Sequence, residues 1–261
     1  HYLSGWIMSM IDRIFMNNFK GTTETGLYSV GYQFGNVVNV LTTAVNQAYV
    51  PWFFEQEKQG PQGRARIIKI AEMLTVIYCF IALVISFFSL EILKIMVTEN
   101  YWTAWKYIPF MSFAYVFNSL YYFYVNVLFL DKTKWIPLIT FGGASAGVIL
   151  NILLIPVLGG IGASISSLIS LFICSLLSLL LSQKVNHSIK FKWVKMYLFT
   201  GLFFILACIS FIVPNNLNHL SILIGKIFFV TVLLTWCCYL YRKDVIFIRK
   251  IIVKKYFRSS Y

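Results

Sequence analysis

Apolar residues along the chain fall into long stretches that are separated by short polar segments. A helix needs about 20 predominantly apolar residues to cross a bilayer. Segments of about this length cover roughly residues 1–19, 25–54, 70–93, 107–130, 135–157, 161–183, 196–214 and 221–241. The pattern therefore predicts an all-α protein, a polytopic membrane helix bundle with about eight transmembrane helices.

The fifth and sixth of these segments share one charge-free run, residues 135–183. This run is long enough to cross a bilayer twice. Residues 156–160 in its middle read Pro-Val-Leu-Gly-Gly, and proline and glycine end a helix and permit a tight reversal. We therefore expect two antiparallel helices that meet at this point.

The composition excludes two broad classes of protein. Of the 261 residues, 59% are hydrophobic and only 12% are charged, whereas a soluble domain carries roughly 25% charged residues. A soluble globular enzyme and a disordered chain are both excluded. The net charge of +13 does not indicate nucleic-acid binding, because the lysines and arginines lie in short patches between the apolar stretches.

The positions of these basic residues predict the topology. With the N-terminus placed inside, 17 of the 22 lysines and arginines fall in inside segments, and only Lys20, Lys94 and Lys106 fall in outside loops. The inside residues are Lys58, Arg64, Arg66, Lys69, Lys132, Lys134, Lys184, Lys190, Lys192, Lys195, Arg242, Lys243, Arg249, Lys250, Lys254, Lys255 and Arg258. Cytoplasmic loops of membrane proteins carry such an excess, so both ends of the chain are expected to be cytoplasmic.

We divide the chain into three parts. Residues 1–183 form a transmembrane bundle of six spans, residues 184–241 add two spans, and residues 242–261 form a basic cytoplasmic tail. The tail alternates basic and apolar residues, which favours a helix lying on membrane lipids of the inner leaflet over a segment that binds a partner protein.

The second segment carries polar residues along one face. At helical spacing these residues fall within about 140° of one another, and they are Ser29, Tyr32, Gln33, Asn36, Asn39, Thr43, Asn46 and Gln47. Two interpretations stand: hydrogen bonds between helices, or the wall of a water-accessible cavity. The number of amides favours the cavity.

The fourth segment repeats this pattern more weakly. One face carries Tyr115, Asn118, Ser119, Tyr122 and Asn126. Amides, hydroxyls and aromatic rings suit a sugar, and they also suit an aromatic belt at the level of the lipid headgroups.

Small residues gather in the fifth and sixth segments, where they predict close helix packing. They are Gly142, Gly143, Gly147, Ser164, Ser167, Cys174, Ser175, Ser178 and Ser182. The five cysteines have no CxxC spacing and are interpreted as small buried side chains.

Asp12 and Arg13 are adjacent opposite charges inside the first segment. A charge near the bilayer centre costs about 2.5–3.5 kcal/mol on insertion scales. In one interpretation Arg13 extends toward the interface while Asp12 pairs with it or with a neighbour. In the other, Arg13 faces a cavity and binds a phosphate with two parallel hydrogen bonds, and Asp12 holds the guanidinium or exchanges a proton.

Catalytic patterns are missing from the sequence. It contains no Ser/His/Asp set, no paired carboxylates, no metal-ligand cluster and no glycine-rich phosphate loop. We expect neither an enzyme nor a cofactor.

Several motifs together resemble the Wzx-type polysaccharide flippases of the MOP (MATE-like) exporter superfamily. They are Asp12-Arg13-Ile14-Phe15, Gly26-Leu27-Tyr28-Ser29-Val30-Gly31-Tyr32, Asn46-Gln47-Ala48-Tyr49-Val50-Pro51-Trp52-Phe53-Phe54, Ile95-Met96 with Tyr101 and Ala104, and Leu150-Asn151-Ile152-Leu153-Leu154-Ile155-Pro156 followed by Gly159-Gly160-Ile161-Gly162-Ala163-Ser164. The resemblance covers most of residues 1–185, and it depends on the order of the motifs.

The resemblance implies a two-lobe transporter of which this chain would be the C-terminal part, without the N-terminal lobe. It also implies transport of undecaprenyl-diphosphate-linked oligosaccharide across the bacterial inner membrane by alternating access, coupled to H⁺ or Na⁺. A MATE-like multidrug or cation antiporter is the alternative. The residues expected to contact substrate are Asp12, Arg13, Gln33, Asn36, Asn39, Asn46, Gln47, Asn118, Tyr122 and Asn126.

Overall fold

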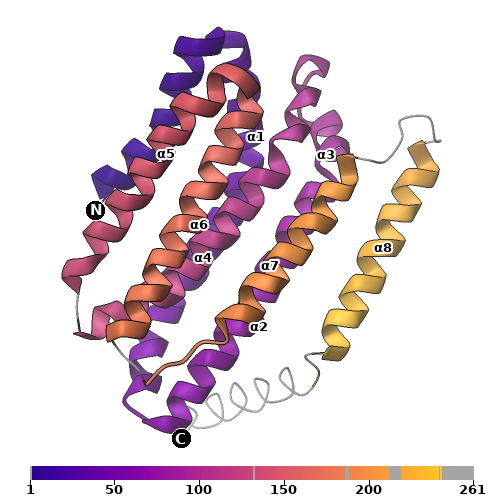
Figure 1. The fold of residues 1–261 in the computed structure, drawn as a ribbon. Coiled ribbons are helices and arrows are strands. Elements are labelled where there is room, and N and C mark those ends of the chain that lie inside the picture. Colours follow the sequence, from indigo (N-terminus) through magenta and orange to yellow (C-terminus); the bar gives the residue numbers. More distant parts are fainter. Residues whose placement is uncertain (1, 132, 186–187, 212–218, 241, 243–261) are drawn as a thin grey trace, which may run out of the picture. The chain divides into compact units, whose positions relative to one another are not determined.

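The computed structural model describes residues 2–131, 133–185, 188–211, 219–240 and 242. Every regular element in this part of the chain is an α-helix or a short 3₁₀ helix. The chain divides into two compact units, His1–Val213 and Pro214–Tyr261. The first unit contains α1 to α7 and the second contains α8 (Figure 1). The predicted class, an all-α polytopic bundle, is confirmed.

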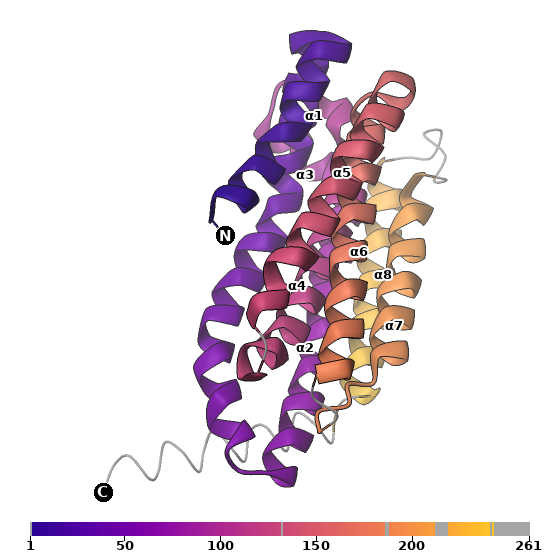
Figure 2. The ribbon, with the colours of Figure 1, turned by 60° about the vertical axis from the view of Figure 1, so that its left-hand side comes forward.

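The helix α1 (Tyr2–Glu57) consists of two arms that run in opposite directions (Figures 1 and 2). The arms meet at Gly21, whose φ of 83° and ψ of 178° are not helical. Glycine adopts this conformation readily because it lacks a Cβ atom. Residues 2–20 are called the first arm and residues 22–57 the second arm. They correspond to the first two predicted segments.

The remaining elements follow the predicted segments closely. They are α2 (Pro61–Phe87), α3 (Ser89–Met96), η1 (Glu99–Lys106), α4 (Ile108–Asp131), η2 (Thr133–Trp135), α5 (Ile136–Leu158), α6 (Gly160–Val185), α7 (Trp193–Cys208), η3 (Ile209–Phe211) and α8 (His219–Leu240). The predicted third segment is the one that divides, into α2 and the short helix α3.

The reversal between α5 and α6 lies where the sequence predicts it. Pro156 remains inside α5, which continues to Leu158. Gly159 then takes a φ of 58° and α6 begins at Gly160. Glycine again provides a conformation that other residues adopt only at a cost.

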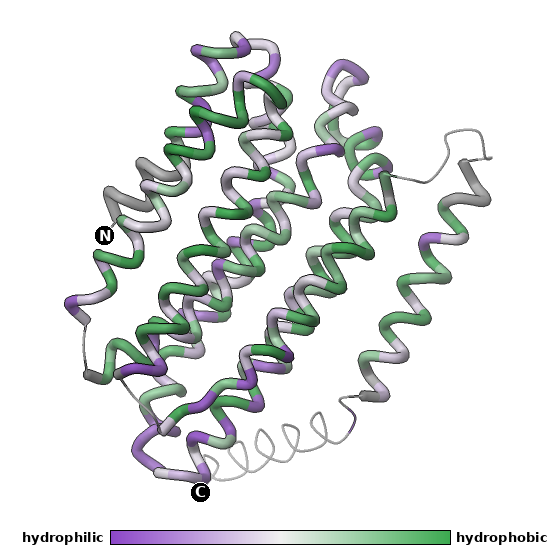
Figure 3. The backbone as a smooth tube through the Cα atoms, in the orientation of Figure 1, coloured by the Kyte–Doolittle hydropathy of each residue, from purple (hydrophilic) through white to green (hydrophobic). Residues whose placement is uncertain are grey.

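Loops alternate between the two ends of the first unit. The turns at residues 58–60 and 133–135 and the segment 188–192 lie at the lower end in Figure 1, while the turn between the two arms of α1, η1 and the turn between α5 and α6 lie at the upper end. Figure 3 shows hydrophilic residues in the turns at both ends and mostly apolar residues along the helices between them. This alternation agrees with the predicted topology. The cytoplasmic side stays a prediction.

Two of the lower segments are joined by ion pairs. The Lys195 Nζ of α7 lies 3.0 Å from the Glu72 Oε2 of α2. Lys192 Nζ lies 3.5 Å from the other carboxylate oxygen of Glu72. Because Glu72 is buried, these lysines fix the start of α7 against α2.

Four helices in the described part of the chain are long and apolar enough to cross a membrane: Pro61–Phe87, Ile108–Leu130, Thr133–Leu158 and Gly160–Lys184. Trp193–Cys208 and Leu223–Cys237 are shorter apolar helices. Both arms of α1 are less hydrophobic than these four, because amide and hydroxyl side chains interrupt their apolar residues.

The small residues of α5 and α6 pack as predicted. The Ser170 hydroxyl donates a 2.7 Å hydrogen bond to the carbonyl oxygen of Gly143. A Cβ atom on Gly143 would overlap the sulfur of Cys174, and one on Gly147 would crowd Ser170. The absence of these Cβ atoms therefore lets the two helices approach closely.

Two predictions are not tested by the fold. Residues 243–261 lie outside the described residues, so the basic tail stays a prediction. The division of the chain at residue 183 also stays a prediction.

Within the first unit, α7 packs on α2, where the Cys79 thiol donates a 3.5 Å hydrogen bond to Thr200.

Candidate functional site

A buried carboxylate joins four segments of the first unit. Asp12, in the first arm of α1, is only 6% exposed. Its Oδ1 accepts a 2.6 Å hydrogen bond from the Asn151 amide of α5. Its Oδ2 accepts hydrogen bonds from the Tyr28 hydroxyl of the second arm, at 2.9 Å, and from the Ser167 hydroxyl of α6, at 2.8 Å. We call Asp12, Tyr28, Asn151 and Ser167 the carboxylate cluster.

The reversal at Gly21 makes this cluster possible. In a continuous helix, two residues 16 positions apart are separated by about 24 Å along the axis. The hydrogen bond between Tyr28 and Asp12 spans 16 positions, so it requires the two arms to lie side by side. The backbone conformation of Gly21 thus brings the Tyr28 hydroxyl to the Asp12 carboxylate.

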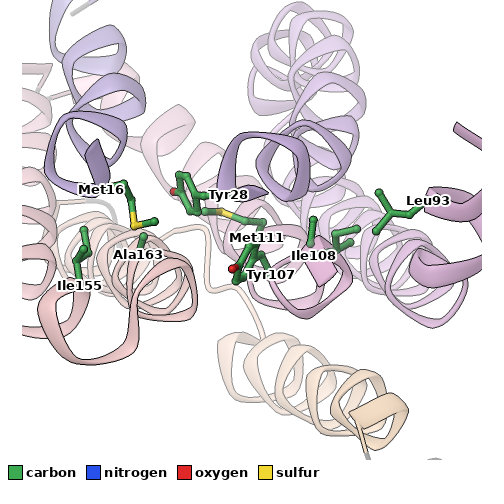
Figure 4. Close-up of a cluster of buried hydrophobic side chains, with 9 residues drawn as sticks. Met16, Tyr28, Leu93, Tyr107, Ile108, Met111, Ile155 and Ala163 are labelled. Carbon is green, nitrogen blue, oxygen red and sulfur yellow. The ribbon is translucent and has the colours of Figure 1, made fainter. Parts of the chain in front are cut away.

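An apolar cluster lies beside the carboxylate cluster and fixes the same elements (Figure 4). Met16, Ile155 and Ala163 are fully buried in it. Each lies one helical turn from a member of the carboxylate cluster: Met16 from Asp12, Ile155 from Asn151, and Ala163 from Ser167. Packing of these side chains holds the polar groups within hydrogen-bonding distance of Asp12.

Asp12 pairs with neighbours from other segments and not with Arg13, which is one of the two pairings that the first interpretation of the sequence allowed. The oxygens of Asp12 are taken by the three donors of the carboxylate cluster. The Arg13 guanidinium instead lies over the ring of Tyr32, with its Cζ atom 5.0 Å from the ring centroid. The Arg13 Nε is buried, and within the described residues it has no hydrogen-bond acceptor.

Polar residues of the second arm meet α4 in a chain of hydrogen bonds. The Asn118 amide donates to Asn39 at 3.3 Å and to the Tyr122 hydroxyl at 3.1 Å. Asn39 donates in turn to Asn36 at 3.0 Å. The hydroxyls of Thr43 and Tyr122 are 3.5 Å apart. Four of the predicted site residues are therefore brought together here, half-buried between two helices.

A second contact lies further along the same two helices. The buried amide of Asn126 donates a 3.2 Å hydrogen bond to Asn46. A shallow depression adjoins this pair and is lined by Thr42, Val45, Asn46, Tyr49, Tyr78, Ser119, Tyr122 and Phe123. The hydroxyl of Tyr49 is buried there, without a partner in the described residues.

The remaining two predicted site residues lie elsewhere. Gln33 and Gln47 are exposed on the second arm, on the side that also exposes Val40. The predicted polar face therefore divides into a half-buried part that bonds to α4 and an exposed part. The interpretation as hydrogen bonds between helices describes the half-buried part, and the cavity wall stays a prediction for the exposed part.

Tyr28, Asn151 and Ser167 were not among the predicted site residues. Tyr28 and Asn151 entered only through the family motifs, and Ser167 was assigned to packing. One signal was available for Asn151, because it is the single amide in the apolar helix α5. A buried amide in a membrane helix needs a hydrogen-bonding partner. The carboxylate of Asp12, inside another predicted span, is a suitable acceptor for it.

The titratable side chains of the described residues form no metal site. No group of three or more His, Cys, Asp or Glu side chains gathers in this part of the chain. The arrangement instead provides one buried carboxylate with three donors, one buried guanidinium Nε without an acceptor in the described residues, and an amide-rich surface along the second arm.

Comparisons with known proteins identify several similar sequences. A family model described as "Polysaccharide biosynthesis protein" matches residues 2–106, which include both arms of α1. A protein of the Lsg locus of Haemophilus influenzae is 39% identical over 59 residues, 23% of this chain and 15% of the relative. A membrane protein of Methanocaldococcus jannaschii is 25% identical over 208 residues, 77% of this chain and 41% of the relative.

The chain therefore spans well under half the length of the relatives it matches. A second Haemophilus influenzae relative, also named as a membrane protein, is 38% identical over 55 residues, 21% of this chain and 14% of its own length. No solved structure is significantly similar to the chain. The chain is a helical membrane protein that resembles polysaccharide biosynthesis proteins.

Proposed function

We propose that this chain is part of a transporter that moves undecaprenyl-diphosphate-linked oligosaccharide across the bacterial inner membrane for surface polysaccharide synthesis. One observation carries the proposal: in the segment similar to polysaccharide biosynthesis proteins, the buried Arg13 Nε has no hydrogen-bond acceptor among the described residues. A buried donor without an acceptor is costly, so this N–H group favours an anionic ligand.

Arg13 would bind the diphosphate of the lipid carrier. A guanidinium presents a planar fork of N–H donors that matches two phosphate oxygens at once. The Arg13 Nε remains free to donate because Asp12 is engaged by other donors. The diphosphate is the feature common to all lipid-linked oligosaccharides of this class, so this contact would be independent of the glycan.

The amide-rich surface would meet the glycan. Gln33 and Gln47 are exposed, and Asn36, Asn39 and Asn118 are half-buried beside them. Sugars present hydroxyl groups that pair with amides, and apolar ring faces that pack on tyrosine rings such as that of Tyr122. These residues would take part in substrate contact when the helices separate, because several are now bonded to one another.

Transport would proceed by alternating access, in which two lobes rock around a central polar site. This chain would supply one lobe, and its partner would be an N-terminal lobe of the longer protein. Asp12 is the candidate for coupling to H⁺ or Na⁺, because it is a buried carboxylate and the Asn151 Oδ1 beside it lacks a partner in the described residues. Both ends of the chain would be cytoplasmic, and no enzymatic step is part of the proposal.

The alternative transporter is a MATE-like multidrug antiporter. Such a protein favours acidic cavity residues that attract cationic drugs. Here the one carboxylate of the cluster accepts hydrogen bonds from three donors, while the buried Nε of Arg13 has no acceptor among the described residues. The electrostatics therefore favour an anionic substrate.

A complementation experiment tests the proposal. The full-length gene would be expressed in a strain that lacks its own polysaccharide flippase, and surface polymer and the inner-leaflet pool of lipid-linked oligosaccharide would be measured. We expect restored polymer and a depleted inner pool. Unchanged polymer from correctly inserted protein, tested with its native glycan and joined by a changed drug-resistance profile, would overturn the proposal in favour of the antiporter.

A further inference from the structure

The guanidinium of Arg13 is held in place by an aromatic ring. Its Cζ atom lies 5.0 Å from the centroid of the Tyr32 ring, within the range of a cation–π interaction. No other described residue pairs with this guanidinium by a hydrogen bond or an ion pair. The two residues come from different arms of α1, so the contact depends on the reversal at Gly21.

The ring of Tyr32 is itself fixed by two neighbouring rings. The Tyr115 ring of α4 meets it edge-on, with centroids 6.2 Å apart. The Tyr28 ring, one turn earlier on the second arm, lies at 6.3 Å. Tyr28 is fully buried, Tyr115 is 8% exposed, and Tyr28 also bonds to Asp12. Tyr32 is therefore placed between two buried side chains that cannot easily move.

We propose that Tyr32 is the positioning residue of the anion site. Its ring face orients the Arg13 guanidinium and stabilises the positive charge without taking up any of its N–H donors. This inference rests on the proposed function, because it assumes that Arg13 binds the diphosphate.

The choice of a ring over a carboxylate has a physical consequence. A carboxylate partner would accept two of the guanidinium N–H groups and cancel its charge. The aromatic face attracts the cation through its quadrupole and leaves the N–H groups of the guanidinium without a bound acceptor. The three donors on Asp12 have a complementary role, since they satisfy the one acid that could otherwise compete for Arg13.

Binding of inorganic pyrophosphate to the purified full-length protein tests the inference. Titration calorimetry would compare the natural protein with Tyr32→Leu, Tyr32→Phe, Tyr32→Trp and Arg13→Ala. Tyr239→Leu is the matched control, because Tyr239 is 76% exposed on α8. The melting temperature of each variant would show whether it is folded.

We expect Tyr32→Leu to weaken pyrophosphate binding by about 3- to 30-fold, the range of a cation–π contact from exposed to desolvated sites. Tyr32→Phe and Tyr32→Trp keep a ring face and are expected to bind within about twofold of the natural protein. In an Arg13→Ala background, Tyr32→Leu should have no further effect, because the interaction that it removes is already lost.

Two different failures can be told apart. If Arg13→Ala binds pyrophosphate as well as the natural protein does, Arg13 is not the anion site and the proposed function loses its support. If Arg13→Ala abolishes binding but folded Tyr32→Leu binds normally, only the role of Tyr32 is wrong. Equal losses in Tyr32→Leu and Tyr32→Phe would also overturn it, since the hydroxyl and not the ring face would then be required.

Discussion

The Asn151 amide of α5 donates a 2.6 Å hydrogen bond to Asp12, which lies 139 residues earlier in the chain. This contact ties the first arm of α1 to α5, and Ser167 ties the same carboxylate to α6. A buried polar cluster thus joins the segments that enclose it. Hydrogen bonds to a charged group are stronger than neutral ones, so this cluster should dominate the polar stabilisation of the bundle.

Replacing Asn151 tests that ranking. Asn151→Leu removes a donor from a buried carboxylate and should lower the free energy of unfolding by about 1.5–3 kcal/mol. Asn118→Leu is the matched control, because it removes half-buried neutral hydrogen bonds between helices, which average about 0.6 kcal/mol each in membrane proteins. Unfolding in mixed detergent micelles would measure both. Equal losses of unfolding free energy would mean that the carboxylate cluster stabilises the bundle no more than the neutral hydrogen bonds do.

Substitution by alanine should change the stability of the protein in opposite directions at Gly21 and at Gly201. A Cβ atom at either position meets no atom within 4 Å, so only backbone conformation matters. Gly21→Ala forces alanine to a φ of 83° and should destabilise the protein by about 1–2 kcal/mol. Gly201→Ala, inside helix α7, should be neutral or stabilise by up to about 1 kcal/mol. Thermal unfolding of the two variants checks this, and a tolerated Gly21→Ala would argue against the reversal.

The close approach of α5 and α6 predicts that one substitution destabilises the protein and that a second one restores its stability. Gly143→Ala would overlap the sulfur of Cys174 and should cost about 1–3 kcal/mol. Adding Cys174→Ala removes that sulfur and should recover most of the loss. Melting temperatures of the two single variants and the double variant measure the coupling. Additive losses in the double variant would show that the two residues are not in contact.

The two lysines bound to Glu72 should contribute differently to the free energy of unfolding. The Lys195 contact is the shorter one, and the Lys192 side chain is 67% exposed. Lys195→Ala weakens the neutralisation of a buried carboxylate and should cost about 1–3 kcal/mol, whereas Lys192→Ala should cost less than about 1 kcal/mol. Chemical unfolding of each variant gives the comparison. The reverse order would mean that Lys192, and not Lys195, forms the dominant ion pair with Glu72.

The sequence predicts the elements of this fold well. Hydropathy alone finds both arms of α1 and the starts of α5 and α6, because apolar length is what the bilayer requires of each segment. The pair Gly159-Gly160 marks the reversal it was expected to mark. Gly21 was not singled out, because glycine in a polar loop is common and only the structure shows its positive φ.

The candidate site was predictable only in part. Faces of single helices follow from helical spacing, so the polar stripe of the second arm was found. The partners across helices do not follow from spacing. The structure pairs Asp12 with Asn151 rather than with the adjacent Arg13, since the reversal at Gly21 and the packing of Met16 set the distances. The sequence pattern also does not distinguish Ser167 from the other small residues of α6, so its bond to Asp12 could not be predicted.

Direct transport by the reconstituted full-length protein tests the central claim that Arg13 is the anion-binding group of a lipid-diphosphate transporter. Liposomes would contain a fluorescent polyprenyl-diphosphate oligosaccharide, and a membrane-impermeant quencher would report how much of it reaches the outer leaflet. The natural protein should increase the fraction that the quencher reaches over time, Arg13→Lys should slow transport because it loses the paired N–H contact, and Arg13→Ala should reduce transport to the level of empty liposomes. Transport by Arg13→Ala at the rate of the natural protein would contradict the account.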